Sequence, residues 1–274
     1  MGLSQDKLKF FADYIEKQLG IIYSDTNYFQ LEHRLNDITI QLGLKDTEEL
    51  WHKAKLSIDG QFKALLLDLA TNNETSFFRD SHIFQGIEHC LIPELKKKNS
   101  FLPSIRFWSA AASTGQEAYS IAMIMDQLKK VYPDTPEYSI FLTDYSERVL
   151  NRAKAGKYTQ LEVQRGLPAK NLITYFSKNE DNNWTINNTI KSHLSFKQLN
   201  LLDNWSFPED FHVVFCRNVL IYQSVENKKI VVDKIHKSLA TGGFLVMGAA
   251  ESLLGISNQF EQIQYQNAVY YRKI

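Results

Sequence analysis

Between residues 105 and 248, short apolar segments alternate with helical ones, and this alternation constrains the fold more than any other feature of the sequence. The apolar segments cover residues 105–110, 138–144, 212–216 and 244–248. Helical patterns cover residues 116–130, 147–154 and 227–239. Strands that alternate with helices are typical of a parallel sheet with crossover helices. The sequence therefore predicts an α/β domain over residues 99–274.

Residues 1–98 have a different pattern, because their apolar side chains recur at helical spacing. Examples are Leu8, Phe11, Tyr14 and Ile15, then Leu31, Leu35, Ile38 and Leu42, with a third periodic segment over residues 62–69. Gly20, Gly43 and Gly60 stand where we expect helices to stop. This part is predicted to be a small helical bundle followed by a linker.

Two further segments interrupt or extend the α/β pattern. Residues 157–196 form a polar insertion, in which residues 184–190 and 193–196 are predicted to be short antiparallel strands near a turn-rich stretch at 179–183. Residues 260–265 and 268–272 are predicted to form a hairpin at the edge of the sheet. We expect a small β-subdomain inserted into the larger domain.

Composition excludes several classes of function. The chain has 31 Lys and Arg against 31 Asp and Glu, so no overall positive charge attracts nucleic acid or an anionic membrane. No apolar run reaches the ~18 residues of a spanning helix, and the polar start lacks a signal peptide, so we expect a cytoplasmic protein that is not embedded in a membrane. Cys90 and Cys216 are too few for a disulfide framework. Without an HExxH or CxxC motif, no metal site is predicted.

Ligands of an open α/β sheet lie beyond the carboxyl ends of the strands, so the residues after each strand are the first candidates for a site. The first strand is followed by Ser109 and a loop of small residues up to Gly115, where a ligand or only a tight turn could be accommodated. Asp144 ends the second strand, where its carboxylate can accept hydrogen bonds from a ribose diol or cap the next helix. Asn200 can pair with an adenine edge or serve as a turn residue.

The strand that ends at Cys216 is followed by two residues that favour a functional interpretation. Arg217 beside an apolar strand end is costly to desolvate unless it meets an anion, and the Tyr222 hydroxyl could reach the same space. Cys216 itself is interpreted as a small core residue. Residues 71–79 join the two predicted domains, where small-molecule sites often occur, although Phe77, Phe78 and Arg79 could also be core and surface residues.

Taken together, these segments resemble the CheR-type chemotaxis methyltransferases over nearly the whole chain. The resemblance is carried by residues 71–79 (NxTxFFR), 107–120 (WSAxxSTGxExYS), 142–158 (TD, then AxxGxY), 215–222 (FCRNVxIY) and 242–253 (GGxLxxGxxESL). It implies a helical bundle followed by a Rossmann-like S-adenosylmethionine-dependent methyltransferase domain with an inserted antiparallel β-subdomain. It also implies that the cytoplasmic helices of chemoreceptors are the partners and that their glutamate side chains are methylated.

The resemblance implies two overlapping sets of site residues. Cofactor contacts are expected from Asn73, Thr75, Arg79, Glu117, Asp144, Asn200, Leu201, Arg217 and Asn218. The active-site group is expected to contain Arg79, Arg217 and Tyr222. The inserted subdomain resembles the small β-subdomain that touches receptors in relatives.

The sequence departs from the family pattern in three places. Gln116, Glu117 and Ala118 stand where Glu-Glu-Pro is usual, and Tyr145 replaces a common aliphatic residue. Residues 1–90 hold nine Lys and Arg against fourteen Asp and Glu, whereas relatives often present a basic face there, so the substrate differs or the contact is local, around Lys45, Lys53 and Lys55. Two alternatives therefore stay open: a cofactor-binding sensor or scaffold, and a methyltransferase acting on another carboxylate or protein. A nicotinamide dehydrogenase lacks support because the sequence has no GxGxxG fingerprint.

Overall fold

The computed structural model describes residues 2–99 and 101–274, which divide into two compact units. The first consists of the chain up to Asn72 together with Tyr222–Asn227, and the second of Asn73–Ile221 and Lys228–Ile274. The sequence analysis assigned residues 73–98 to the N-terminal helical bundle and its linker, whereas in the structure these residues belong to the second unit. The physical reason is burial, because Phe77, Phe84 and Leu91 share one hydrophobic core with the strands.

The first unit is helical, as the periodicity predicts. Its helices are α1 (Gln5–Leu19), the short 3-10 helix η1 (Asp25–Asn27), α2 (Tyr28–Gln41), α3 (Thr47–Leu56) and α4 (Gly60–Ala70). Their core contains the fully buried side chains of Phe11, Ile15, Leu35 and Leu50. The expectation for Gly60 is wrong: α3 ends at Leu56, and Gly60 begins α4 rather than stopping a helix.

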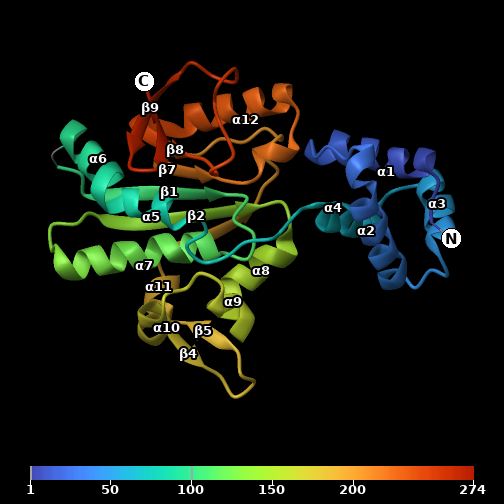
Figure 1. The fold of residues 1–274 in the computed structure, drawn as a ribbon, viewed down its shortest axis with the longest axis horizontal. Coiled ribbons are helices and arrows are strands. Elements are labelled where there is room, and N and C mark those ends of the chain that lie inside the picture. Colours follow the sequence, from blue (N-terminus) through green and yellow to red (C-terminus); the bar gives the residue numbers. More distant parts are fainter. Residues whose placement is uncertain (1, 100) are drawn as a thin grey trace. The chain divides into compact units, whose positions relative to one another are not determined.

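The second unit is built on a seven-stranded sheet in the order β6-β2-β1-β7-β8-β10-β9 (Figure 1). The strands are β1 (Ser104–Ala110), β2 (Glu137–Asp144), β6 (Leu194–Gln198), β7 (Phe211–Cys216), β8 (Leu239–Val246), β9 (Phe260–Tyr265) and β10 (Ala268–Lys273). Strands β6, β2, β1, β7 and β8 are parallel, and β10 pairs antiparallel with both β8 and β9. The predicted α/β class and the C-terminal hairpin at the sheet are confirmed.

Both faces of the sheet are covered, since side chains of a strand alternate between its two faces. Ile105 and Phe107 of β1 point into one core, whereas Trp108 and Ala110 point into the other. The first core is closed by α5 (Ser81–Gly86), the π-helical turn η2 (Ile87–Leu91), α6 (Ile92–Lys98), α7 (Gln116–Val131) and α8 (Glu147–Ala155). The second is closed by α12 (Val225–Ser238), which lies opposite α7 (Figure 1).

The insertion contains the expected small antiparallel sheet, in the order β3-β5-β4. Its elements are β3 (Lys157–Tyr158), α9 (Gln160–Gln164), α10 (Ala169–Tyr175), β4 (Phe176–Lys178), β5 (Trp184–Ile186) and α11 (Asn188–Lys191). Two details of the prediction are wrong. Residues 188–190, expected in a strand, belong to α11, and residues 194–196 of the expected strand at 193–196 lie in β6, which pairs parallel to β2 in the large sheet. Among the described residues, no helix has the length and apolar character needed to cross a membrane.

Candidate active site

The order of the strands reverses beside β1, and this point defines the candidate site. The chain runs outward from β1 to β2 and β6, then returns to the other side of β1 to form β7 and β8. In open α/β sheets, the crevice at such a switch point, beyond the carboxyl ends of the strands, is where ligands bind. The loops after β1, β2 and β7 therefore form the candidate site.

The loop between β1 and α7 has an unusual backbone. Ala111, Ser113 and Gly115 all have positive φ angles, of 57°, 51° and 91°. A glycine is required at position 115 for two reasons. A Cβ there would lie 2.9 Å from the Ala153 Cβ, and the positive φ is unfavourable for any residue with a side chain. Tyr158 fixes the loop from the far side by donating its hydroxyl to the Thr114 carbonyl, 2.8 Å away. The loop of small residues is thus a rigid backbone surface.

Asp144 connects the loops that follow β1 and β2. Its Oδ2 accepts the Ser113 N–H and its Oδ1 accepts the Ser146 N–H, both at 2.9 Å. The sequence also allowed Asp144 to cap the next helix. In the structure the N-cap of α8 is Ser146, whose hydroxyl accepts the Val149 N–H. Asp144 is buried at the carboxyl end of β2, where a carboxylate is placed to accept hydrogen bonds from a ribose.

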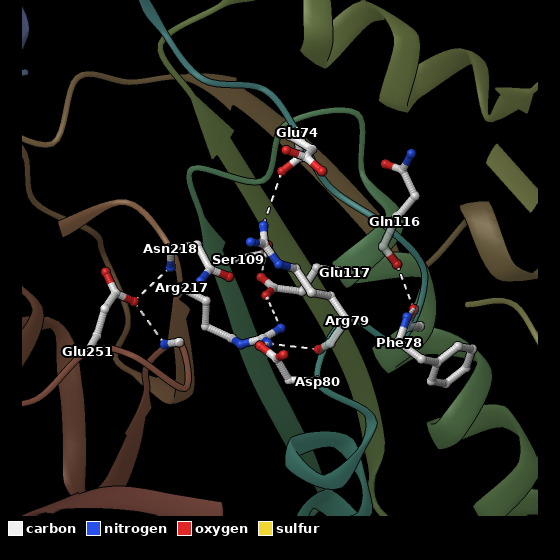
Figure 2. Close-up of polar contacts among 12 residues, drawn as sticks. Glu74, Phe78, Arg79, Asp80, Ser109, Gln116, Glu117, Arg217, Asn218 and Glu251 are labelled. Carbon is white, nitrogen blue, oxygen red and sulfur yellow. Dashed lines mark hydrogen bonds and ion pairs between the residues drawn. The ribbon is translucent and has the colours of Figure 1, made fainter. Parts of the chain in front are cut away.

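A buried ionic cluster joins the loop after β7 to α7 and to the segment before α5 (Figure 2). The Arg217 guanidinium donates to Glu117 Oε2 at 3.1 Å and to Asp80 Oδ2 at 2.7 Å, and Nη2 also donates to the Arg79 carbonyl at 2.8 Å. Ser109, near the end of β1, donates its hydroxyl to the other Glu117 oxygen at 2.7 Å. Asp80 reaches this position with φ at 59°.

The electrostatics of this cluster follow from burial. The Arg217 side chain is only 2% exposed and lies over the Phe84 ring, so its charge requires the two carboxylates. Its Nε is buried and makes no hydrogen bond within the part of the chain that the structure describes. The expectation that Arg217 meets an anion is thus met by the chain's own Asp80 and Glu117. Two carboxylates against one guanidinium leave the cluster formally negative.

Glu251 holds the residues after Arg217. Its Oε2 accepts the N–H groups of Asn218 at 2.7 Å (Figure 2) and Gly248 at 2.8 Å. Its Oε1 accepts the Ile221 N–H at 3.2 Å. Asn218 has φ at 58°, a conformation that Asn tolerates better than most residues. The loop after β7 and the loop after β8 are therefore joined through one carboxylate.

Arg79 and its neighbours come from the segment before α5. The Arg79 guanidinium donates to the Glu74 carbonyl at 3.2 Å, and Glu74 forms an ion pair with Arg165 of the insertion. The Asn73 carbonyl accepts the Ser113 hydroxyl at 2.7 Å, which brings this segment to the loop after β1. Thr75 is half-buried within the same segment.

Asn200 and Leu201 follow β6. The Asn200 side-chain oxygen accepts the Leu202 N–H at 3.0 Å, which is the turn role that the sequence also allowed. The Leu199 N–H donates to the Asp144 carbonyl at 2.9 Å, so this turn lies beside the end of β2. Leu201 packs against the core on the α12 face.

Tyr222 belongs to the first unit, whereas Arg79 and Arg217 belong to the second. Its hydroxyl accepts a hydrogen bond from the Asn72 amide at 2.8 Å. Together with Tyr23 and Arg34 it lines a pocket of about 190 Å³. Cys216 is fully buried, as expected of a core residue, and burial holds the pKa of its thiol well above the usual value.

Sequence reasoning missed two residues of this site, Asp80 and Glu251, and it named the loop that holds Ser109 and Ser113 without giving either serine a role. Asp80 follows Arg79 directly and Glu251 lies in a segment that carries the family resemblance, so proximity to a motif was the available signal. Their partners are distant in the chain, however, and a single Asp or Glu in a loop ordinarily indicates a solvated residue.

Comparisons with known proteins agree with this geometry. The family model described as "CheR methyltransferase, SAM binding domain" matches residues 73–269. "Chemotaxis protein methyltransferase 1" of Pseudomonas aeruginosa is 35% identical over 274 residues, which cover 99% of each chain. "Chemotaxis protein methyltransferase Cher2" of Pseudomonas putida is 34% identical over 96% of each chain. "Chemotaxis protein methyltransferase" of Vibrio parahaemolyticus is 32% identical over 98% of each chain.

Proposed function

The chain belongs to the CheR methyltransferase family, and from this premise we propose that it transfers the methyl group of S-adenosylmethionine to glutamate side chains of chemoreceptors, forming methyl esters. It is a chemotaxis methyltransferase that uses S-adenosylmethionine. The finer assignment, a protein-glutamate O-methyltransferase, is ours. The observation that carries it is the convergence of Asp144, Glu117 and Arg217 at the carboxyl edge of the sheet, inside the matched segment.

The residues present at this edge fit the cofactor. S-adenosylmethionine combines a ribose with cationic sulfonium and amino groups, and when bound it supplies a methyl group activated by the positive sulfur. The formally negative cluster of Glu117, Asp80 and Arg217 suits a cation. The buried carboxylate of Asp144 suits a ribose, and the loop of small residues from Ala111 to Gly115 lets a ligand approach the backbone.

Nine residues are proposed to contact the cofactor. They are Asn73, Thr75, Arg79, Glu117, Asp144, Asn200, Leu201, Arg217 and Asn218. Support comes from their positions in the segment before α5 and after β1, β2, β6 and β7. In this proposal Glu117 meets positive charge, Asp144 accepts from hydroxyl groups, and Arg217 keeps Glu117 oriented through the 3.1 Å ion pair.

The acceptor carboxylate needs orientation rather than activation. A glutamate side chain has an ordinary pKa of about 4.3, so at neutral pH it is already ionised and nucleophilic, and no general base is required. We assign its orientation to Arg79, Arg217 and Tyr222, of which Tyr222 donates a hydrogen bond without transferring its proton. The Asn72 amide supports this role because it donates to the Tyr222 oxygen, so the phenolic proton is directed elsewhere.

The proposed partners are the cytoplasmic helices of chemoreceptors, and the proposed location is the cytoplasm. Support for the location comes from two cysteines, Cys90 and Cys216, which are both free and buried as expected in a reducing compartment. The small sheet of the insertion, β3-β5-β4, is proposed as an additional receptor contact.

The test is a transfer assay with methyl-labelled S-adenosylmethionine. Membranes that contain chemoreceptors are compared with the same membranes lacking them and with an unrelated acidic protein. The proposal expects label in the receptors alone. Label in the acidic protein or in receptor-free membranes instead would replace the receptor by another substrate, and binding of S-adenosylhomocysteine without any transfer would indicate a sensor or scaffold.

A further inference from the structure

Glu251 is a carboxylate whose three hydrogen bonds in the structure all go to backbone N–H groups of two separate loops. Asn218 and Ile221 belong to the loop after β7, and Gly248 lies just beyond the end of β8. The three donors come within 2.7 Å, 3.2 Å and 2.8 Å of its oxygens. Hydrogen bonds to an ionised acceptor are stronger than neutral ones, so this carboxylate fixes both loops together.

The loop that Glu251 holds needs such support. Asn218 has a left-handed backbone, which is unfavourable for a residue with a side chain even though Asn tolerates it better than most. It directly follows Arg217, so the conformation at Asn218 sets where the chain goes after the buried guanidinium. Without the carboxylate, the Asn218 N–H would lose its acceptor and the left-handed conformation would lose its main support.

The packing around Glu251 is specific. A Cβ on Gly248 would lie 2.8 Å from Glu251 Oε2 and 2.7 Å from the Asn218 side-chain nitrogen. Only a glycine at this position leaves room for the carboxylate and the Asn218 amide to lie together. Gly248 and Glu251 of the loop after β8 therefore form one unit with Asn218 of the loop after β7.

We propose that Glu251 is a positioning residue of the methyltransferase, which holds the turn 217–221 so that Arg217 and Asn218 face the cofactor. This inference rests on the function proposed above, because it assumes that these two side chains serve methyl transfer. Glu251 itself acts through the backbone and is not assigned a contact with substrate or cofactor.

The number of acceptor oxygens predicts a graded series of variants. Glu251→Gln keeps one oxygen, which can serve the Asn218 and Gly248 N–H groups, but its amide then faces the Ile221 N–H. Glu251→Ala keeps none. We expect kcat to fall about tenfold in Glu251→Gln, as for the loss of one charged hydrogen bond, and about 100-fold in Glu251→Ala, as for a displaced catalytic group. Neither variant should change KM for the receptor.

Two measurements test the series, with Glu261→Gln as the matched control because Glu261 is an exposed carboxylate of β9 paired with Arg272. The first is kcat and KM with labelled S-adenosylmethionine. The second is amide hydrogen exchange of the peptide covering 217–221, measured in the protein alone. Exchange should accelerate in the order wild type, Glu251→Gln, Glu251→Ala, while β1 peptides and the control stay unchanged.

The outcomes separate this inference from the proposed function. If the wild-type protein transfers no methyl group, the proposed function is overturned, whereas the exchange experiment still tests whether Glu251 holds the turn 217–221. If the wild-type protein is active and both Glu251→Gln and Glu251→Ala leave kcat and exchange unchanged, the positioning role of Glu251 is overturned. A parallel rise in exchange over the whole chain would also overturn it, since a general loss of structure is not positioning. If Glu251→Ala does not fold, Glu251→Gln alone decides.

Discussion

Arg217 and Glu117 form a buried ion pair, with Nη1 lying 3.1 Å from Oε2. The pair joins the loop after β7 to the first turn of α7, on the two sides of the switch point in the sheet. Because Arg217 Nη2 also lies 2.7 Å from Asp80 Oδ2, the positive charge of the guanidinium is balanced by carboxylates of its own chain. Arg217 is thereby suited to hold Glu117 in place for a cationic ligand.

Replacing Arg217 by alanine should destabilise the second unit strongly. The change leaves the partly buried carboxylates of Asp80 and Glu117 facing each other without a cation. Breaking a fully buried pair costs about 3–5 kcal/mol, and because Asp80 is partly exposed we expect a loss near the lower end, of about 3 kcal/mol. Urea unfolding followed by tryptophan fluorescence, to which the buried Trp108 contributes, measures the effect. Lys237→Ala is the control, because Lys237 forms an exposed pair with Asp233 that is worth under about 1 kcal/mol. Equal losses in the two variants would contradict the ion-pair account.

Replacing Asp144 by asparagine should weaken cofactor binding while the protein stays folded. The amide group of the new side chain must face either the Ser113 or the Ser146 N–H, where the carboxylate accepted a hydrogen bond. Toward a ribose hydroxyl, the loss of a charged acceptor costs about 1.5–3 kcal/mol, which corresponds to roughly 10- to 150-fold in Kd. Calorimetry with S-adenosylhomocysteine gives the value, with the exposed Asp134→Asn as control. A Kd within twofold of wild type would remove Asp144 from the site.

Replacing Gly248 by alanine should lower methyl transfer although Gly248 has no side chain of its own. The added methyl carbon would lie 2.7 Å from the Asn218 amide nitrogen and 2.8 Å from Glu251 Oε2, so both groups must move. A shift of this size at positioned groups costs about 100-fold in turnover. The comparison is with the exposed neighbour Ala250→Ser, for which we expect wild-type kcat. Full activity in Gly248→Ala would show that the two loops can separate without harm.

Stability should depend on pH through His212. Burial is the main cause that lowers the pKa of this histidine, and its Nδ1 accepts the Arg106 N–H at 3.0 Å, which requires the unprotonated nitrogen. Between the lowered pKa of the folded protein and the unfolded value of about 6.5, the unfolded state binds more protons, so the free energy of unfolding decreases as pH falls. The slope from this group is at most about 1.4 kcal/mol per pH unit.

The variant His212→Asn isolates that contribution, because its Oδ1 can accept the same N–H and does not titrate. Urea unfolding at several pH values between about 7 and 5 should give a shallower pH dependence for this variant than for wild type. His52→Asn, at an exposed position, is the control. Parallel profiles for wild type and His212→Asn would assign the acid sensitivity to other groups.

The central strands could be predicted from the sequence because they are buried on both faces. Most side chains in runs such as 105–110 and 212–216 are apolar, and a parallel sheet with crossover helices is the consistent solution. The strand β6 could not be assigned in the same way. Its residues 194–198 alternate between half-buried and exposed, and only the non-local pairing with β2 places them in the large sheet rather than in the insertion.

The site could be predicted where burying a residue type is costly unless it has a particular kind of partner. Arg217 at an apolar strand end required an anion, and the structure supplies Asp80 and Glu117. The identity of that anion was not predictable, because Asp80 lies 137 residues earlier in the chain. Glu251 shows the same limit: it is 33 residues from Asn218, and only the fold brings its carboxylate to that N–H.

The chemistry of the transferred methyl group tests the central claim most directly. Purified protein is incubated with methyl-labelled S-adenosylmethionine and a receptor cytoplasmic fragment, and the washed fragment is then treated with mild base. A methyl ester on a carboxylate hydrolyses under these conditions, so the account predicts that the label leaves the fragment as volatile methanol. Label that stays on the fragment after base would mean methylation of nitrogen or another stable position, and it would contradict the account.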